Sequence, residues 1–149
     1  MPNKVRQESQ GVYNKTDTKY DPLKVDGILG PQTIKLTQQL LGVKQDGYIS
    51  NQPMHIKFNI DMNATTSCVW QFVYLRHKYK GGSPMVTMLQ KLVGANADGY
   101  FNKNTINAMQ AFLHGKGFSC GPVNGILGPR TVEAWQRYLN YKYGKGEVE

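Results

Sequence analysis

The residues able to do acid–base or metal chemistry are few and scattered along the chain. The histidines are His55, His77 and His114. The sequence holds no His-Glu-x-x-His segment and no short His-x-x-x-His or His-x-x-x-Asp spacing, which are the patterns that zinc sites use. We therefore expect exposed or structural histidines and no metal site.

The two cysteines, Cys68 and Cys120, form no recognisable nucleophile or metal motif. Neither belongs to a Cys-x-x-Cys pair, which argues against zinc and redox chemistry. A catalytic thiol needs a histidine as its base, and the sequence offers only Cys68 with His77 or Cys120 with His114. Neither cysteine stands at a strand-to-helix turn, so we expect two free thiols, although a disulfide between them stays possible.

Paired carboxylates and phosphate-binding loops give no better active site. Glycoside hydrolysis needs two poised carboxyl groups, yet three of the glutamates lie near the chain ends: Glu8, Glu147 and Glu149. The segment 61–65 begins like a calcium loop but lacks the glycine and the later glutamate. No GxxxxGK[ST] or GxGxxG segment is present. The sequence thus predicts a protein that is not an enzyme and needs no cofactor.

A short turn with Asp-Gly or Asn-Gly at its centre occurs four times, over residues 25–30, 45–50, 97–102 and 123–128. In such a turn the Asp or Asn side chain accepts a hydrogen bond from the backbone two residues on, and glycine takes a positive φ. We therefore expect a structural role for the residue before each glycine: Asp26, Asp46, Asp98 and Asn124.

Four segments align without a gap as helices, over residues 34–41, 86–93, 106–113 and 132–139. Their apolar residues recur with the spacing of one helical face. Each has a glutamine at the same step, and we expect this amide to hold the carbonyl of a neighbouring loop. These glutamines are Gln38, Gln90, Gln110 and Gln136.

Residues at the expected helix ends fit capping rules. Pro31 and Pro129 suit the first helical position, and the last residue of each turn is a permitted N-cap; these are Gly30, Ser50, Asn102 and Gly128. Threonine hydroxyls in the first helical turn can satisfy an orphan N–H; these are Thr33, Thr105 and Thr131. Glycine after a helix is a usual left-handed stop, as expected for Gly42, Gly94 and Gly115.

Together these patterns predict a mainly α fold of tandem short turn-helix repeats that share one core. The expected parts are a polar arm at 1–24, a domain at 25–143 and a frayed tail at 144–149. Within the domain the repeats span 25–52, 84–102, 103–122 and 123–143. An insertion at 53–83 breaks the pattern, and its aromatic and β-branched residues around Trp70 favour an extended segment over a short helix.

Length and charge bound the protein class. A chain of 149 residues fits one ordinary domain. The formal charge of +8, from 18 basic and 10 acidic residues, attracts polyanions such as nucleic acid or wall phosphate polymers, or serves solubility alone. No secretory signal precedes residue 30 and no apolar stretch is long enough to span a membrane. The protein is therefore expected to act in the cytoplasm, to be delivered outside by another agent, or to be a fragment of a longer chain.

The segment Asn124-Gly-Ile-Leu-Gly-Pro-Arg-Thr-Val-Glu-Ala-Trp-Gln136, and its near twin at 26–33, resemble the peptidoglycan-binding domain of bacterial and phage cell-wall hydrolases. The segments 41–53, 70–72, 81–83 and 89–94 are similar to the C-terminal wall-binding region of endolysins from phages of Gram-positive hosts. The resemblance covers residues 25–140. It departs at Ser50, Asn102 and Asn124, which replace a glycine or an Asp of the turn.

The resemblance implies a non-catalytic module that anchors a lytic domain, placed N-terminal to this chain, to the bacterial wall. It also implies synthesis in a host cytoplasm without a signal peptide and action at the bacterial cell wall after release. Its partner would be peptidoglycan, wall polysaccharide or teichoic acid; pairing between copies is an open possibility, and no membrane contact is expected. Tethering raises the concentration of an enzyme at its insoluble substrate. The alternatives are a basic nucleic-acid-binding domain, suggested by the basic and aromatic segments 74–80 and 137–143, and a structural protein that uses the same repeats for assembly.

Recognition of a glycan needs aromatic faces for the sugar ring and amide side chains for hydroxyl and acetamido groups, and stem-peptide carboxylates favour an arginine. The candidate ligand-binding residues are therefore Tyr48, Asn51, Gln52, Trp70, Tyr100, Asn102, Asn104 and Arg130. Core packing is the competing interpretation for Trp70 and Trp135, and turn packing for Tyr48 and Tyr100. The turns that bear tyrosine, 46–52 and 98–104, are the expected place of the ligand.

Overall fold

In a computed structural model, residues 22–73 and 82–144 are described. The chain divides into two compact units, residues 24–139 and the terminal residues 1–23 with 140–149. The expected arm at 1–24 lies mostly outside the described residues. In the terminal unit, Leu23 N–H donates to Asn140 Oδ1 at 2.7 Å, and Asn140 Nδ2 donates back to the Leu23 carbonyl at 3.0 Å.

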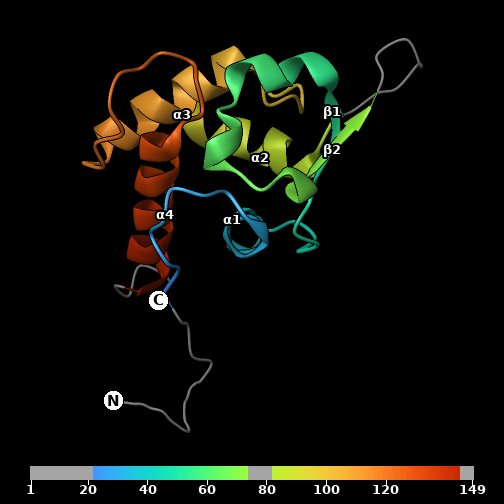
Figure 1. The fold of residues 1–149 in the computed structure, drawn as a ribbon. Helices are drawn as coiled ribbons and strands as arrows, with labels where there is room; N and C mark the ends of the chain where they lie inside the picture. Colours follow the sequence, from blue (N-terminus) through green and yellow to red (C-terminus); the bar gives the residue numbers. More distant parts are fainter. Residues whose placement is uncertain (1–21, 74–81, 145–149) are drawn as a thin grey trace, which may run out of the picture. The chain divides into compact units, whose positions relative to one another are not determined.

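The described residues are mainly α-helical, as the sequence predicts (Figure 1). The α-helices are α1 (Pro31–Leu41), α2 (Pro84–Val93), α3 (Lys103–Gly115) and α4 (Pro129–Gly144). Short 3-10 helices occupy η1 (Met54–Asn59), η2 (Met62–Ala64) and η3 (Ser67–Val69). The strands are β1 (Ile49–Pro53) and β2 (Trp70–Val73).

The ends of α1 follow the capping rules that the sequence suggests. Pro31 opens the helix after the extended residue Gly30, and Gly42 closes it in the left-handed region at φ 73°. Gly94 closes α2 in the same way at φ 86°. The expected stop at Gly115 is wrong, because this residue is still helical and the left-handed residue is Gly117, at φ 91°.

The insertion contains an extended segment around Trp70, as expected, but it is mostly short 3-10 turns before that point. Strands β1 and β2 pair in parallel, with Ile49 opposite Trp70 and an irregularity between Ile49 and Gln52. Two isolated parallel bridges join the insertion to two of the turns, Thr65 to Leu29 and Ile60 to Leu127. The insertion therefore packs on turns that are far from it in sequence.

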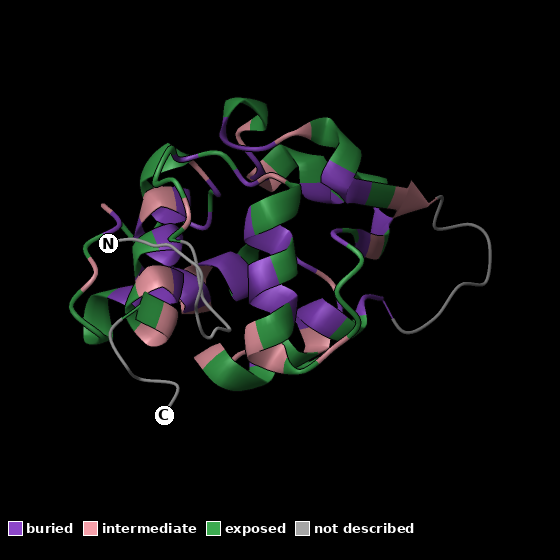
Figure 2. Ribbon diagram, turned by 90° about the horizontal axis from the view of Figure 1, so that it is seen from below, coloured by how far each residue is buried: buried purple, intermediate pink, exposed green. Residues whose placement is uncertain are grey.

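The core of unit 24–139 is built where the helices and turns meet. Figure 2 shows buried and exposed residues alternating along the helices, as amphipathic helices require. The second apolar residue of every turn is buried, and the set is Leu29, Ile49, Phe101 and Leu127. Trp135 is 1% exposed and its Nε1 donates to Thr37 Oγ1 at 2.9 Å, which ties α4 to α1.

Candidate functional site

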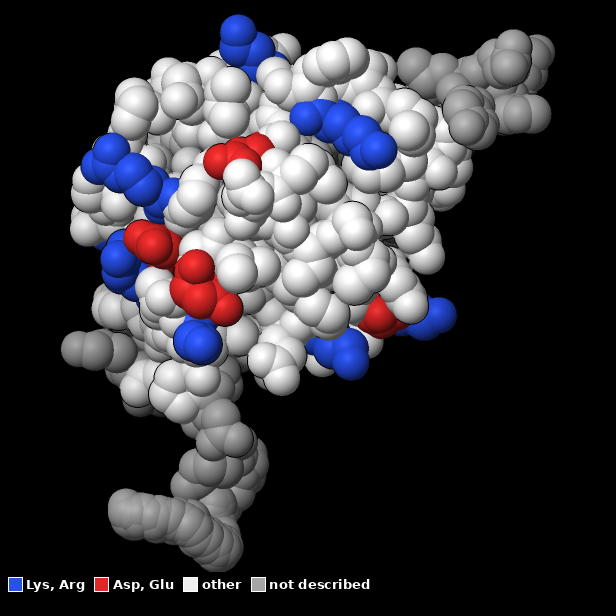
Figure 3. Space-filling model, viewed as in Figure 1, with Lys and Arg blue, Asp and Glu red and all other residues white. Residues whose placement is uncertain are grey.

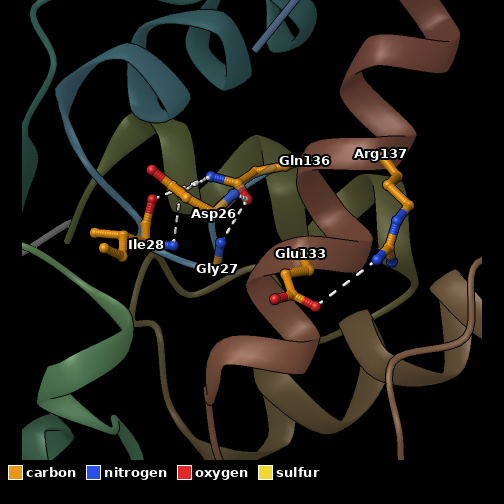
Figure 4. Close-up of polar contacts among 6 residues, drawn as sticks. All are labelled: Asp26, Gly27, Ile28, Glu133, Gln136 and Arg137. Carbon is orange, nitrogen blue, oxygen red and sulfur yellow. Dashed lines mark hydrogen bonds and ion pairs between the residues drawn. The ribbon is translucent and has the colours of Figure 1, made fainter. Parts of the chain in front are cut away.

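A buried glutamine on each α-helix holds one of the Asp-Gly or Asn-Gly turns. Gln136 on α4 is shown in Figure 4: its Nε2 donates to Asp26 Oδ1 at 3.0 Å and to the Ile28 carbonyl at 3.1 Å, and its Oε1 accepts from Gly27 N–H at 3.0 Å. Asp26 Oδ1 also accepts from Ile28 N–H at 2.9 Å, which is the turn predicted from the sequence. Gln136 Oε1 also accepts from Asp26 N–H at 3.1 Å, so one amide satisfies four polar groups of the turn.

The same arrangement recurs three more times. Gln38 holds the turn at 46–48, Gln90 holds the turn at 98–100 and Gln110 holds the turn at 124–126. In each case the amide nitrogen bonds the turn's side chain and its carbonyl, and the amide oxygen accepts from the glycine N–H. The expectation that these amides hold loop carbonyls is confirmed, and their burial leaves the four glutamines structural.

The first-turn threonines act differently from the expectation. In three turns the glutamine Nε2 also contacts a threonine hydroxyl of the next helix, as Gln90 does with Thr105 Oγ1 at 2.8 Å; the others are Gln110 with Thr131 and Gln136 with Thr33. The orphan Thr105 N–H is satisfied instead by the N-cap Asn102, whose Oδ1 accepts it at 3.0 Å. Each of these threonines therefore links the helix that follows a turn to the helix whose glutamine holds that turn.

The turn at 45–50 is the exception, because no helix follows it. Ser50 lies in strand β1, so its predicted role as a helix N-cap is wrong. The aligned threonine position holds Pro53, and the next α-helix begins only at Pro84. There Ser83 is the N-cap, and its side chain accepts from Val86 N–H at 3.3 Å. The insertion thus separates two cap positions, Ser50 and Ser83, that a short connection would have merged into one.

A pocket with a volume of about 120 Å³ lies between these two cap positions. It has polar and apolar parts. The lining residues are Gln38, Val43, Lys44, Asp46, Tyr48, Ser50, Ser83, Pro84 and Met85. Tyr48 is 45% exposed at its edge, whereas Ser83 is only 1% exposed. We name this the Tyr48 pocket and take it as the candidate site.

The Tyr48 pocket carries one positive and one negative side chain. Partial burial disfavours the charge of Asp46, but hydrogen bonds from Tyr48 N–H and the Gln38 amide, with the nearby charge of Lys44, outweigh it and lower the pKa of Asp46. Asp46 is therefore ionised at neutral pH. The pocket is close to electrically balanced rather than a cationic site.

Three of the candidate ligand-binding residues are structural in the described chain. Gln52 is fully buried, and its side chain bonds the Gly99 carbonyl at 2.9 Å and Phe101 N–H at 2.8 Å. Trp70 is 5% exposed, with its Nε1 bonded to Thr65 Oγ1 at 2.9 Å. Asn102 is the N-cap of α3. Gln52 and Trp70 cannot present their side chains to a large external ligand, which corrects the expectation for both.

The other candidates lie on the surface but do not all meet. Tyr48 lines the pocket. Asn51 is exposed, has a left-handed φ of 53°, and donates from Nδ2 to the Gly82 carbonyl at 3.3 Å. Asn104 and Arg130 are exposed in the first turns of α3 and α4, and Tyr100 is half-buried; none of these three lines the Tyr48 pocket.

Sequence reasoning missed Lys44, Ser50 and Ser83 as lining residues of the site. A signal for the serines was present, because Ser50 stands at the cap position of its turn and Ser83 precedes the next Pro-initiated helix. An insertion that starts after Ser50 and ends at Ser83, the N-cap of the next helix, could have been expected to bring these two serines close together. Lys44 had no comparable signal.

Other chemistry finds little support among the described residues. They contain no cluster of His, Cys, Asp or Glu that could hold a metal ion. Cys68 is exposed, Cys120 is buried, and both are free, as expected. Within residues 22–73 and 82–144, no helix has the length and apolarity needed to cross a membrane.

The charged surface gives no continuous basic strip on the face shown in Figure 3. Lys and Arg side chains lie there at separate positions, with Asp and Glu between some of them. On α4, Glu133 and Arg137 form an ion pair at 3.7 Å. A face of this kind does not favour tracking along a nucleic-acid backbone, which needs a positive groove.

Comparison with known proteins gives no relative. No protein-family model matches the chain, and neither curated proteins nor solved structures provide a match.

Proposed function

We propose that this chain is a non-catalytic module that binds the bacterial cell wall and anchors a lytic enzyme to it, as the wall-binding regions of phage endolysins do. In this proposal the four turn-helix units are tandem repeats of the peptidoglycan-binding type. The observation that carries the proposal is the Tyr48 pocket, which opens beside an exposed aromatic ring at the one turn where a helix is replaced by an insertion.

The turns support this proposal because different residues hold the turn and face the solvent. All four use the same glutamine contacts, so their framework is fixed by groups that no ligand needs to touch. In three of the four turns the first apolar residue points outward, with Ile28 41% exposed, Tyr48 45% and Ile126 42%, whereas Tyr100 is half-buried. A tyrosine in place of isoleucine adds a hydroxyl and an aromatic face at a position that the fold leaves free.

The chemistry of the pocket suits a polar, largely uncharged ligand. Binding sites for small groups are concave, with apolar walls and a few placed polar groups. Val43, Pro84 and Met85 supply apolar walls, and Ser50 and Ser83 supply hydroxyls. A wall glycan presents both kinds of surface.

The test is co-sedimentation of the purified chain with Gram-positive cell walls, together with assays for released reducing sugar and free amine. We expect the chain to sediment with walls and to release neither product. Tyr48→Ile installs the residue that the turns at 26–30 and 124–128 already carry, so it removes the ring and preserves the turn. It should weaken wall binding at least tenfold.

The matched control is Ile126→Ala, which trims an equally exposed side chain on an equivalent turn. It should leave wall binding unchanged. A chain that ignores walls and retards DNA would overturn the proposal in favour of nucleic-acid binding. If both variants lost the same amount of wall binding, the Tyr48 pocket would not be the binding site.

A second candidate is assembly with other protein copies, and one observation favours it. Phe58 on η1 is 85% exposed, and Val123 is 50% exposed. Large exposed apolar side chains mark interaction surfaces when they are contiguous. Sedimentation velocity at several concentrations separates the candidates, since self-association without wall binding supports assembly.

A further inference from the structure

We infer that the Tyr48 pocket takes the acetamido group of an N-acetylated sugar, with the Tyr48 ring against the sugar face, and that it does not take a wall phosphate. This inference rests on the proposed wall-binding function. It deepens that function by choosing the glycan strand over the anionic polymer.

The size of the pocket fits a substituent rather than a whole saccharide. Its volume of about 120 Å³ is somewhat below the roughly 150 Å³ of a cavity that holds benzene. An acetamido group has four heavy atoms and fits easily. The pyranose ring to which it is attached must then stay outside, where the half-exposed Tyr48 ring offers a flat apolar face.

The lining matches both ends of an acetamido group. Val43, Pro84 and Met85 provide an apolar surface for the methyl. Ser83 Oγ accepts from Val86 N–H and the residue is only 1% exposed, so the half-buried Ser50 offers the hydroxyl that can donate to a ligand carbonyl oxygen. Both serines line the pocket.

The charges of the pocket oppose a phosphate. Lys44 attracts an anion, but Asp46 lines the same small volume. Asp46 Oδ1 is fixed by Gln38 Nε2 at 2.9 Å and by Tyr48 N–H at 3.0 Å, so the carboxylate cannot turn away without breaking the turn. A phosphate in the pocket would sit against this fixed carboxylate, whereas a neutral amide meets no such repulsion.

The backbone makes the pocket wall rigid. Gly82 has φ 56°, and a Cβ at this position would collide with the Gly99 carbonyl. That carbonyl also accepts from Ser83 N–H at 2.9 Å and from Gln52 Nε2 at 2.9 Å. The backbone of Ser83 is thereby held by the neighbouring tyrosine-bearing turn, and a preorganised pocket wall loses little entropy on binding.

The experiment is a titration of the isotope-labelled chain, followed by NMR, with three soluble probes at matched concentration. The probes are tri-N-acetylchitotriose, cellotriose, which carries hydroxyls in place of the acetamido groups, and a short poly(glycerol phosphate). We expect tri-N-acetylchitotriose to bind at least tenfold tighter than cellotriose. Its shift changes should centre on Tyr48, Ser50 and Ser83.

Two variants and a control complete the test. Tyr48→Ile and Ser50→Leu, which fills the pocket, should each lower the affinity for tri-N-acetylchitotriose at least tenfold, while Ile126→Ala leaves it unchanged. Unfolding curves of all three identify any variant whose loss comes from misfolding.

The inference would be overturned if the two sugars bound with equal affinity. It would also be overturned if the phosphate polymer shifted the NMR signals of the pocket residues. If the chain sediments with walls but binds none of the probes at the pocket, the acetamido assignment fails while the proposed function survives. If it does not sediment with walls, the proposed function itself fails.

Discussion

Gln136 Nε2 donates a hydrogen bond to Asp26 Oδ1 at 3.0 Å, although the two residues stand 110 positions apart in the chain. Each of the other three glutamines holds the turn that comes next in the chain after its own helix, as Gln38 holds the turn at Asp46. Gln136 instead reaches back from the last helix to the first turn (Figure 4). The contact closes unit 24–139 into a ring of helices and turns.

Gln136→Ala should therefore destabilise the whole unit. It removes a buried amide and leaves the Asp26 and Gly27 N–H groups without their acceptor, which costs about 3 kcal/mol of unfolding free energy. The measurement is urea denaturation followed by tryptophan fluorescence. Gln39→Ala, at an exposed position of α1, is the control and should change stability little; equal effects would show that the contact does not close the ring.

Gly82→Ala should damage both folding and the pocket. A Cβ there meets the Gly99 carbonyl, and the residue has φ 56°. The strained backbone and the forced displacement together should cost about 3 kcal/mol or more. Gly94→Ala is the matched control, because Gly94 also has a positive φ but nothing within 4 Å of an added Cβ; it should cost about 1 kcal/mol. Thermal unfolding of both variants checks the difference, and similar losses would contradict the collision.

Acid should weaken the fold partly through Asp26 and Asp46. For each, partial burial opposes the charge, but side-chain and backbone hydrogen bonds and a nearby lysine lower the pKa. A lowered folded-state pKa stabilises the protein above the unfolded pKa of about 4, and this stabilisation disappears as pH falls through the folded-state value.

The double variant Asp26→Asn with Asp46→Asn removes both titrations and keeps the turn, because Asn124 already accepts from Ile126 N–H at 3.0 Å in the same role. Its stability should depend less steeply on pH below pH 4 than that of the parent chain. Denaturation midpoints across this range test the point, and parallel curves for the two proteins would refute it.

The two thiols should react at very different rates. Cys68 is exposed, whereas Cys120 is buried, and burial raises the pKa of Cys120 despite the opposing effects of its own backbone N–H and the Arg130 charge. Since the thiolate is the reactive form, a disulfide reagent should modify Cys68 quickly and Cys120 only on unfolding. Reaction kinetics of Cys68→Ser and Cys120→Ser, with and without denaturant, assign the phases; fast native modification of Cys120 would contradict its burial.

Local chemistry in the sequence determined where α-helices begin and how the Asp-Gly and Asn-Gly turns fold. Pro31 and Pro129 open their helices because a proline at the first position loses no hydrogen bond. Asp-Gly and Asn-Gly fold as predicted because the short side chain can reach the N–H two residues later as soon as the backbone turns. These interactions are short in sequence, so pattern alone reveals them.

The tertiary structure decided which residues form the candidate site. Ser50 has the sequence of a helix cap, yet it lies in β1 because that strand pairs with β2 through Ile49 and Trp70. Gln52 has an amide side chain that could bind a sugar, yet it is buried because the turn at 98–102 supplies its hydrogen-bond partners, the Gly99 carbonyl and Phe101 N–H. Both outcomes depend on contacts between segments that are distant along the chain. No local pattern encodes the gap between Ser50 and Ser83 in which the Tyr48 pocket lies.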